Sequence, residues 1–571
     1  MIFRWLADII KVAGRDNSGK TCLSPSNRRP VAEIASVNLL KIPGVQKNTE
    51  ESQKEQRSAL KNRDMEETKV KQIARSVLAV LLTAGLLLVG CTGRKTPGSD
   101  SGTTPPGTTD GTDNDLYADL PQGDFENQDF VILNNISDYA ITTMVPDDLS
   151  SAVSSAIFSR NEYVKQELDI NLKVKELPYA ENKELMERLT ISDLGGKNEY
   201  DICYNESWAQ AILAQRGVYK SVNDYASYLN FNKPWWYSAA MEELSVYDNL
   251  FYVVGDMQLM WYESIWCLAF NTDVLAAYGI ESPYTDVRNN TWTFERMHEI
   301  ASQTHVEGAT PNHYGVASHI AFASAMLSAA DIRICRQDEK EGLVLSELDT
   351  RFSDVYGTIM RDFFSDNGND RENYIRTSYD SESYTSGKFA TKDTQWVFEE
   401  GRATFLGGTI GDMRLYVAGK AIPYGIVPLP KYDSNQAQYV SYVYEAGALC
   451  GVPRNLGSED RLRRVCTVME WLCAISYQVV KPEYYNVILQ GRIAKDPIAS
   501  QMLDVVLGLT DLGITRLELD NIFRLGTASV IQRRISDNKN AVTGVKTSLP
   551  LINSNLSGVL KAFRPAAETT P

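Results

Sequence analysis

Hydrophobic and polar residues follow two alternating patterns along the part of the chain that begins at Asp129. Apolar runs of four or five residues are typical of buried strands, and longer stretches with apolar residues every three or four positions are typical of helices. These patterns predict strands at 129–133, 170–174 and 201–204, and helices at 149–168 and 181–190. Strand–helix–strand units of this length form parallel sheets with right-handed crossovers, so we expect an α/β lobe.

Two loops lie where an open α/β sheet binds its ligands, beyond the carboxyl ends of the strands. The first is 134–139 and the second is 205–208, in which Ser207 can also cap the next helix. Candidate ligand residues in these loops are Asn135, Asp138, Tyr139, Asn205, Glu206 and Trp208. The alternative is that both loops are simple capping turns.

A segment rich in aromatic residues follows at 261–266. Flat rings stack on the C–H faces of sugars, and a carboxylate accepts hydrogen bonds from their hydroxyl groups. Trp261, Glu263 and Trp266 are therefore candidate ligand residues. The alternative is a buried strand whose aromatic side chains belong to the core.

Residues 65–91 have the pattern of a bacterial lipoprotein signal. Basic residues precede the apolar run 77–89, which is too short to span a bilayer, and the segment ends in Val-Gly-Cys91. Cys91 is expected to be lipidated after removal of 65–90 as the signal peptide. The following residues, up to about 127 and dominated by Gly, Ser, Thr, Pro and Asp as far as 115, predict a flexible tether. An ordinary signal peptide followed by a chance cysteine is the alternative.

Residues 1–64 precede this signal and are interpreted as a mis-assigned start or a disposable leader. Gly14–Thr21 matches the phosphate-binding pattern G-x-x-x-x-G-K-T. That pattern requires a helix directly after the loop, and Pro25 and Pro30 break any helix there. No nucleotide-binding site is therefore predicted.

Net charge and the spacing of Cys and His residues exclude several classes of partner and ligand. The formal net charge is −16, which argues against nucleic acid because phosphate binding needs a basic surface. The cysteines of the body form no C-x-x-C pair, and the histidines lack metal-site spacing, so we expect neither a metal nor a cofactor. Cys203 and Cys450 lie in apolar runs and are predicted to be buried, whereas one disulfide of unknown pairing stays possible.

Several short motifs in the same order resemble the extracellular solute-binding proteins of ABC importers, the maltose-binding-protein-like family 1. They are Phe270–Asp273, Tyr278–Ile280, Ser282–Tyr284, Thr291–Glu295, Gln395–Phe405, Gly425–Pro430 and Ala446–Pro453. Within them, Thr293 is a plausible helix cap and Trp292 packs at the helix entry.

The resemblance implies an α/β, two-lobed fold of the type II periplasmic-binding-protein kind, with parallel-rich sheets flanked by helices and hinge strands between the lobes. Lobe 1 would hold 128–266 and 431–478, and lobe 2 would hold 267–430 and 479–560. The chain would cross between the lobes near Ile265–Phe270 and Tyr424–Pro430. A ligand cleft is expected between Trp266 and the Gly407 loop.

Many sugar-binding members carry an aromatic residue just after a Gly-Gly pair. Here Gly407-Gly408 is followed by Thr409 and Ile410, which weakens the sugar assignment at that position. Asp412, Arg414 and Tyr416 are the polar candidates that remain on this side, with a surface helix as the alternative, and Thr409 is kept as a candidate ligand residue. Tyr444 and Glu445, just before the last motif, complete the set of candidate ligand residues.

The function implied is the capture of a small solute, with carbohydrate favoured, and its delivery to the permease of an ABC importer. The protein would be a monomer without catalytic activity, held by its lipid on the extracytoplasmic side of the cell membrane. Three alternatives stay open. They are a secreted carbohydrate-active enzyme, which would need two facing carboxylates among Glu206, Glu263 and Glu445, a sensor or adhesion lipoprotein, and a transport protein for peptides or polyamines.

Overall fold

The computed structural model describes residues 116–136, 144–146, 148–306, 313–319, 321–364, 375–377, 391–494, 496–536 and 539–565. All of them belong to Pro105–Pro571, the second of the two units into which the chain divides. The predicted leader, signal peptide and Cys91 lie outside the described residues, as do Asp138 and Tyr139. Among the described helices, none combines the length and the apolar character that crossing a membrane requires.

The first sheet has the strand order β2-β1-β3-β13-β4. Its strands are β1 (Gln128–Ile136), β2 (Ile170–Pro178), β3 (Ile202–Glu206), β4 (Tyr252–Val253) and β13 (Ala448–Gly451). The predicted strands β1, β2 and β3 pair in parallel, and β13 joins antiparallel to both β3 and β4. Phe130, Ile132 and Leu133 of β1 are fully buried, which explains the short apolar run in the sequence.

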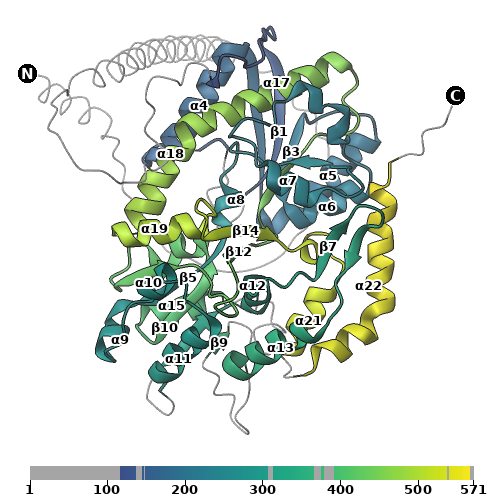
Figure 1. Ribbon diagram of the computed structural model, residues 1–571. Coiled ribbons are helices and arrows are strands. Elements are labelled where there is room, and N and C mark those ends of the chain that lie inside the picture. The colour runs from purple at the N-terminus through teal and green to yellow at the C-terminus, as the bar shows by residue number, and fades with distance from the viewer. Residues whose placement is uncertain are drawn as a thin grey trace, which may run out of the picture. The chain divides into compact units, whose positions relative to one another are not determined.

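Helices cover both faces of this sheet. They are α4 (Ala152–Leu168), α5 (Asn182–Leu194), α6 (Ser207–Gln215) and α17 (Glu459–Ile475). α4 packs on α17 and α5 on α6, and the two pairs lie on opposite sides of β1 and β3 in Figure 1. This is the arrangement that right-handed crossovers produce when the chain moves first to β2 and then back past β1 to β3.

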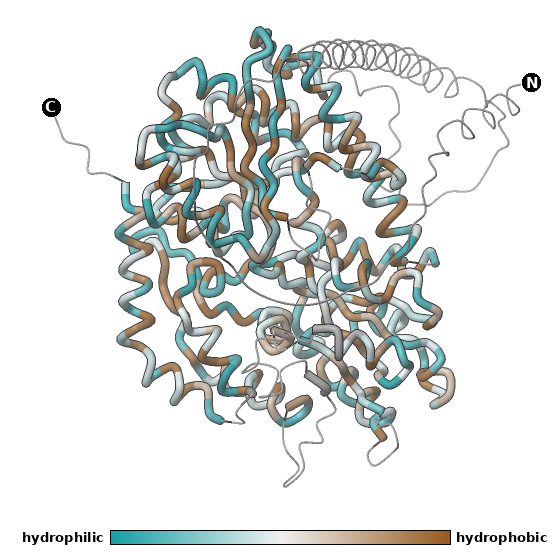
Figure 2. The backbone as a smooth tube through the Cα atoms, turned by 180° about the vertical axis from the view of Figure 1, so that it is seen from behind, coloured by the Kyte–Doolittle hydropathy of each residue, from teal (hydrophilic) through white to brown (hydrophobic). Residues whose placement is uncertain are grey.

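The second sheet has the order β11-β5-β10-β6-β9. Its strands are β5 (Trp266–Asn271), β6 (Tyr314–Ser318), β9 (Ile375–Thr377), β10 (Ala403–Thr409) and β11 (Tyr424–Val427). β10 is antiparallel to β5 and parallel to β6. In Figure 2 brown, apolar stretches run through the interior, whereas the outer helices alternate between brown and teal.

Helix α11 (Phe294–Thr304) packs on this second sheet and confirms two predictions. The Thr293 side chain accepts a hydrogen bond from the backbone N–H of Arg296, so it is the helix cap. Trp292 is fully buried, and its indole N–H donates to the Pro428 carbonyl at 2.9 Å.

Among the described residues, three passages connect the first sheet and its helices with the second sheet and its helices. The first passage, Ser264–Ile265, joins α8 (Met260–Glu263) to β5, and the second runs from β12 (Tyr439–Val443) to β13. The two passages touch, because Ile265 bridges Val443 and the Tyr444 N–H donates to the Ser264 carbonyl at 2.9 Å. The third passage lies between α17 and α19 (Pro497–Val506).

The return to the first sheet comes later than the sequence pattern indicated. Tyr424–Val427 pairs antiparallel with β5, so it belongs to the second sheet. The chain then forms β12, which pairs in parallel with β14 (Gly513–Leu517), and reaches the first sheet only at Ala448.

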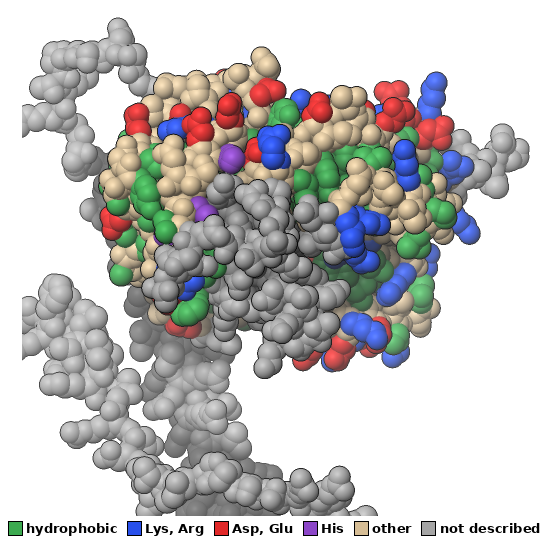
Figure 3. Space-filling model, turned by 90° about the horizontal axis from the view of Figure 1, so that it is seen from below, with side chains coloured by type: hydrophobic (Ala, Val, Ile, Leu, Met, Phe, Trp, Pro, Cys, Tyr) green, Lys and Arg blue, Asp and Glu red, His purple; other side chains and the backbone are tan. Residues whose placement is uncertain are grey.

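The C-terminal part packs along both layers. It contains α20 (Leu519–Ile522), α21 (Thr527–Ser536) and α22 (Ala541–Phe563). α22, drawn in yellow in Figure 1, contacts α21 at one end. Further along it contacts α6, which covers the first sheet. On the face seen from below in Figure 3, acidic and basic side chains are interspersed with apolar ones.

Candidate ligand site

The carboxyl end of β3 meets the second passage at a group of six aromatic and charged side chains, which we call the hinge cluster. Its members are Glu206, Trp208, Tyr442, Tyr444, Glu445 and Arg524. The backbone fixes the two segments together, because Ala448 pairs with Glu206 and the Ser207 N–H donates to the Gly447 carbonyl. The Ser207 hydroxyl also donates to the Glu445 carbonyl at 2.7 Å.

Glu206 is a buried carboxyl group, only 5% exposed. Its pKa is raised to about 8, mainly by burial and also by the nearby charge of Glu445, while the indole N–H of Trp208 and the charge of Arg524 oppose the shift. The Trp208 N–H donates to one Glu206 oxygen. This shift favours the protonated form of Glu206 at neutral pH, in which the carboxyl group can donate one hydrogen bond as well as accept others.

Glu445 is held from the opposite side. The Tyr442 hydroxyl donates to its Oε2 at 2.8 Å and in turn accepts a hydrogen bond from Asn521 Nδ2 at 2.8 Å. The nearest guanidinium nitrogen of Arg524 lies 3.7 Å from Glu445 Oε1. The same guanidinium lies over the indole ring of Trp208, 4.7 Å from its centroid.

Trp266 adds a hydrogen-bond donor beside this cluster. Its ring packs against Tyr442 and Tyr444 at centroid distances of 6.5 Å each, and the residue is only 2% exposed. Among the described residues, nothing accepts a hydrogen bond from its buried indole N–H. A buried donor of this kind is satisfied when a ligand or a water molecule supplies the acceptor.

The expected position of the cleft between Trp266 and the Gly407 loop is wrong. Trp266 pairs directly with Thr409, and Cys267 pairs with Gly408, in adjacent antiparallel strands of the second sheet. These residues lie side by side in one layer and do not face each other across a gap.

Glu263 is engaged by other parts of the protein. Arg414 Nε lies 3.0 Å from each of its oxygens, Arg414 Nη2 lies 2.8 Å from Oε2, and the Tyr484 hydroxyl donates to Oε1. The side chain is 1% exposed. Glu263 thus joins α8 to the segment after β10 and to the third passage, and a ligand would have to displace these donors to reach it.

Near Glu263, three tyrosine rings surround the ammonium group of Lys481. Tyr237 and Tyr262 lie 5.6 Å from it and Tyr477 lies 4.9 Å from it, all measured to ring centroids. The buried carboxylate of Asp256 is 3.2 Å away. Trp261, which is 7% exposed, packs on the Tyr237 ring at 6.0 Å.

The other predicted site residues make local contacts within the protein. Asn205 is 1% exposed and donates to Asn182 Oδ1 at 2.8 Å, while Asn135 donates to the Leu177 carbonyl at 3.5 Å. Thr409 and Asp412 form a capping box at α16 (Ile410–Asp412), so both side chains stabilise the start of a helix.

The structure thus brings together Glu206, Trp208, Tyr444 and Glu445, with Trp266 beside them. Sequence reasoning missed Tyr442 and Arg524. Tyr442 stands two positions before Tyr444, a spacing that places both side chains on one face of an extended segment. Arg524 has no local signal, since it reaches Trp208 from the C-terminal part of the chain.

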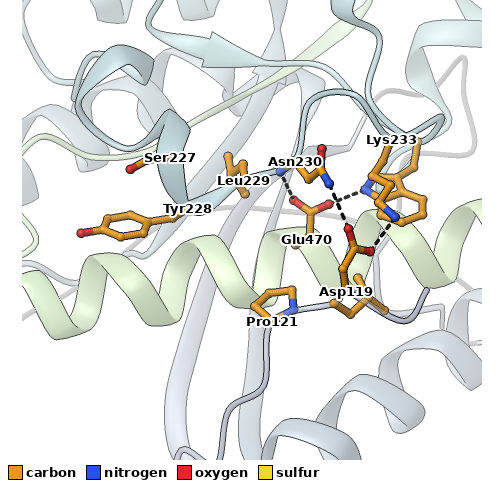
Figure 4. A pocket seen from close by; sticks show the side chains of 10 residues that line it. Asp119, Pro121, Ser227, Tyr228, Leu229, Asn230, Lys233 and Glu470 are labelled. Carbon is orange, nitrogen blue, oxygen red and sulfur yellow. Dashed lines mark hydrogen bonds and ion pairs between the residues drawn. The ribbon is translucent and has the colours of Figure 1, made fainter. Parts of the chain in front are cut away.

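A cavity of about 310 Å³ lies elsewhere, where the segment before β1 packs on the first layer. Figure 4 shows that its polar side chains already bind one another: Asp119 pairs with Lys233 and accepts from Asn230. The buried Glu470 carboxylate accepts hydrogen bonds from the Asn230 N–H and the Trp235 indole N–H. We interpret this cavity as a packing seam, because none of its lining residues belongs to the predicted ligand set.

Within the described part of the chain, no cluster of three or more His, Cys, Asp or Glu side chains could hold a metal ion. Six cysteines are described; all are buried and free, and Cys203 and Cys450 are fully buried as predicted. Burial raises the pKa of the Cys203 thiol to about 12, so this thiol is unreactive.

No protein-family model matches the chain, and no curated protein matches it. Its fold is nevertheless similar to that of solved ABC substrate-binding proteins. A substrate-binding protein from Listeria monocytogenes, in complex with cycloalternan, has a TM-score of 0.50 at 12% identity and covers 76% of this chain and 99% of its own. A cyclic α-maltosyl-1,6-maltose binding protein from Arthrobacter globiformis also has a TM-score of 0.50, at 10% identity, and covers 75% of this chain and 98% of its own. The α/β, two-lobed type II fold that the motifs implied is therefore confirmed.

Proposed function

We propose that this chain is an extracytoplasmic solute-binding lipoprotein, which captures a carbohydrate at the hinge cluster and delivers it to an ABC importer. The observation that carries the proposal is the position of that cluster. Aromatic rings, a protonated carboxyl group and an unpartnered indole N–H gather where two α/β layers are joined by short passages. Rings and paired polar groups of this kind suit a sugar, which offers apolar C–H faces and many hydroxyl groups.

The mechanism follows from the fold. Because the layers are connected by passages that touch at Ile265 and Val443, small backbone rotations there would let them close around a solute. A ligand that contacts both layers favours the closed form by its higher affinity for that form. The permease would then recognise the closed protein. The chain would bind its solute without converting it, which agrees with the similarity of its fold to that of binding proteins.

Membrane attachment is the part of the proposal that rests on the sequence alone. The apolar run 77–89 followed by Cys91, and the tether after it, support export and lipidation of that cysteine. We expect the full chain, expressed in a bacterial host, to incorporate labelled palmitate and to partition into detergent. Cys91→Ala would lose both properties, and continued labelling of that variant would contradict the lipoprotein assignment.

Ligand capture can be tested with residues 105–571, the unit that contains the described core. A thermal-shift screen followed by calorimetry would compare neutral oligosaccharides, cyclic saccharides, sugar acids, peptides and polyamines. A ligand that binds only the folded state raises the melting midpoint. We expect a saccharide to bind and Trp208→Ala to weaken binding at least tenfold. Trp396→Ala is the matched control, because Trp396 is 54% exposed and stacks only on Arg402 in the described structure.

One observation favours a second candidate, a carbohydrate-active enzyme. Glu206 and Glu445 are neighbouring carboxyl groups, and Glu206 is held in the protonated form. A protonated acid beside an ionised carboxylate is the pattern of glycosidases. Incubation of the bound saccharide with the protein, followed by chromatography, decides between the two: intact sugar supports binding alone, and Glu206-dependent cleavage would replace the transport proposal.

A further inference from the structure

Arg524 is the cationic member of the hinge cluster, and its side chain is 43% exposed. The closest carboxylate oxygen, Glu445 Oε1, is 3.7 Å from its Nη1, which is longer than a hydrogen bond. Among the described residues, no acceptor lies within hydrogen-bond distance of the guanidinium group. The five N–H donors of this side chain are therefore available to a ligand.

The fold holds this arginine in place even though its donors are unused. Its backbone adopts the left-handed conformation, with a φ of 53°. Non-glycine residues rarely adopt this conformation, and it persists where the surroundings fix it. Here the buried Phe523 ring packs on Phe563, and Asn555 Nδ2 donates to the Arg524 carbonyl at 3.4 Å. With the backbone fixed in this way, the guanidinium group stacks on the Trp208 ring.

The charges of the cluster indicate which ligand would complete it. Glu206 is neutral, so Arg524 and Glu445 are its two charged groups, and they nearly cancel. The Nη1 atom lies 3.7 Å from Glu445 Oε1. The edge formed by Nε and Nη2 donates no hydrogen bond within the described residues, and an edge of this kind matches both oxygens of a carboxylate. With Arg524 and Glu445 both charged, a bound carboxylate leaves one uncompensated negative charge in the cluster, whereas a dianion such as a phosphate leaves two, so the carboxylate is the less costly anion.

We propose that the hinge cluster selects saccharides that carry a carboxylate, with Arg524 as the residue that determines this specificity. The inference rests on the proposed function and names its substrate class. The sugar ring would pack against the aromatic side chains of the cluster, and its carboxylate would bind the free edge of Arg524. A saccharide with a neutral hydroxymethyl group at that position would leave the guanidinium donors unsatisfied by the ligand.

The test compares matched pairs of trisaccharides by calorimetry on the full chain. The pairs are glucose with glucuronate, galactose with galacturonate, and mannose with mannuronate, and galactose 6-phosphate tests the alternative anion. We expect at least one uronate to bind ten times more tightly than its neutral partner. Its affinity should fall as NaCl is raised from about 0.05 to 0.5 M, because salt screens an exposed charge pair.

Variants at Arg524 separate charge from packing. Arg524→Met keeps the apolar stem on Trp208 and should lose uronate affinity by roughly 10- to 100-fold, the value of a charge-assisted hydrogen bond. Arg524→Lys keeps the charge without the planar edge and should lose less. Arg463→Met is the matched control, since Arg463 also stacks on a ring, that of Tyr228 at 5.0 Å, outside the cluster. Melting curves establish that each variant is folded.

The outcomes are distinguishable. If neutral trisaccharides bind as tightly as uronates, or if Arg524→Met weakens both equally, the specificity inference is wrong and the proposed function stands. Tighter binding of the sugar phosphate would also overturn it. If no saccharide of either kind binds, the proposed function fails and the inference fails with it.

Discussion

Replacing Arg414 by methionine should destabilise the folded body by about 3–5 kcal/mol, the usual cost of removing one partner from a buried ion pair. The Glu263 side chain is 1% exposed and the Arg414 side chain is 15% exposed, so water cannot replace the lost partner. Methionine fills much of the space of the arginine stem, and Tyr484 still donates to Glu263. The loss should therefore come mainly from a buried carboxylate without its cation.

The size of the effect in a melting experiment follows from the size of the unit Pro105–Pro571. At about 2 cal/mol/K per residue, its unfolding entropy is roughly 1 kcal/mol/K, so the midpoint should fall by about 3–5 °C. Urea unfolding followed by tryptophan fluorescence gives the same quantity as a shift in the transition midpoint with an unchanged slope.

A double-mutant cycle tests whether the unpaired charge of Glu263 causes the loss of stability. Glu263→Gln removes the buried charge, so the double variant Glu263→Gln/Arg414→Met should be more stable than Arg414→Met alone, with a coupling energy of about 2 kcal/mol. Arg188→Met is the control, because Arg188 pairs with Glu184 on an exposed helix surface and should leave the midpoint unchanged. An Arg414→Met variant as stable as wild type, or strictly additive effects, would refute the ion-pair argument.

Three further predictions concern other parts of the molecule. Lys481→Met should empty the cage of three tyrosine rings and Asp256, and millimolar tetramethylammonium should raise the melting midpoint of this variant but not of wild type, because a small cation replaces the missing ammonium. The folded-state pKa of Glu206 lies above its unfolded value of about 4.5, at about 8, so its contribution to stability is complete below pH 4.5 and is lost as the pH rises to 8. Glu518 has a pKa raised to about 8 as well, and burial also raises the pKa of Asp256, Asp412 and Asp520. Melting curves of Glu206→Gln between pH 5 and 8 should therefore show a smaller pH-dependent decline than wild type, and an unchanged decline would contradict the assignment. The six buried cysteines should resist a thiol reagent in the native protein and react together in urea, whereas rapid native labelling would show that the core is open.

Local pattern was sufficient for the first layer. The run Phe130–Leu133 is buried as a strand, and the helical spacing at 149–168 corresponds to α4, which ends at Leu168 where Asp169 takes a left-handed cap. The cap expected at Ser207 shows the limit of such reasoning. Ser207 is the first residue of α6, and its hydroxyl binds the Glu445 carbonyl, so a contact from 238 residues away decides its role.

The lack of long-range contacts in the sequence pattern also explains two wrong predictions, which are the place where the chain returns to the first sheet and the position of the ligand cleft. Both came from motifs read in chain order, and chain order does not say which strands become neighbours. Tyr424–Val427 pairs with β5, and β10 follows the other edge of the same strand, so residues expected at a crossing and on a cleft wall are all inside one sheet.

In the candidate site, too, some features could be predicted from local sequence and others depend on the folded structure. Glu206 and Trp208 could be named from the sequence because the carboxyl end of a parallel strand is a binding position whatever packs around it. Whether Glu206 is charged could not be named, since its pKa depends on burial by β13 and on Glu445 and Arg524, which reach it only through the fold. The charge state of one carboxyl group therefore decides what the cluster can bind. An ionised Glu206 beside Glu445 would attract cations such as polyamines, whereas a protonated Glu206 leaves Arg524 free to bind an anion.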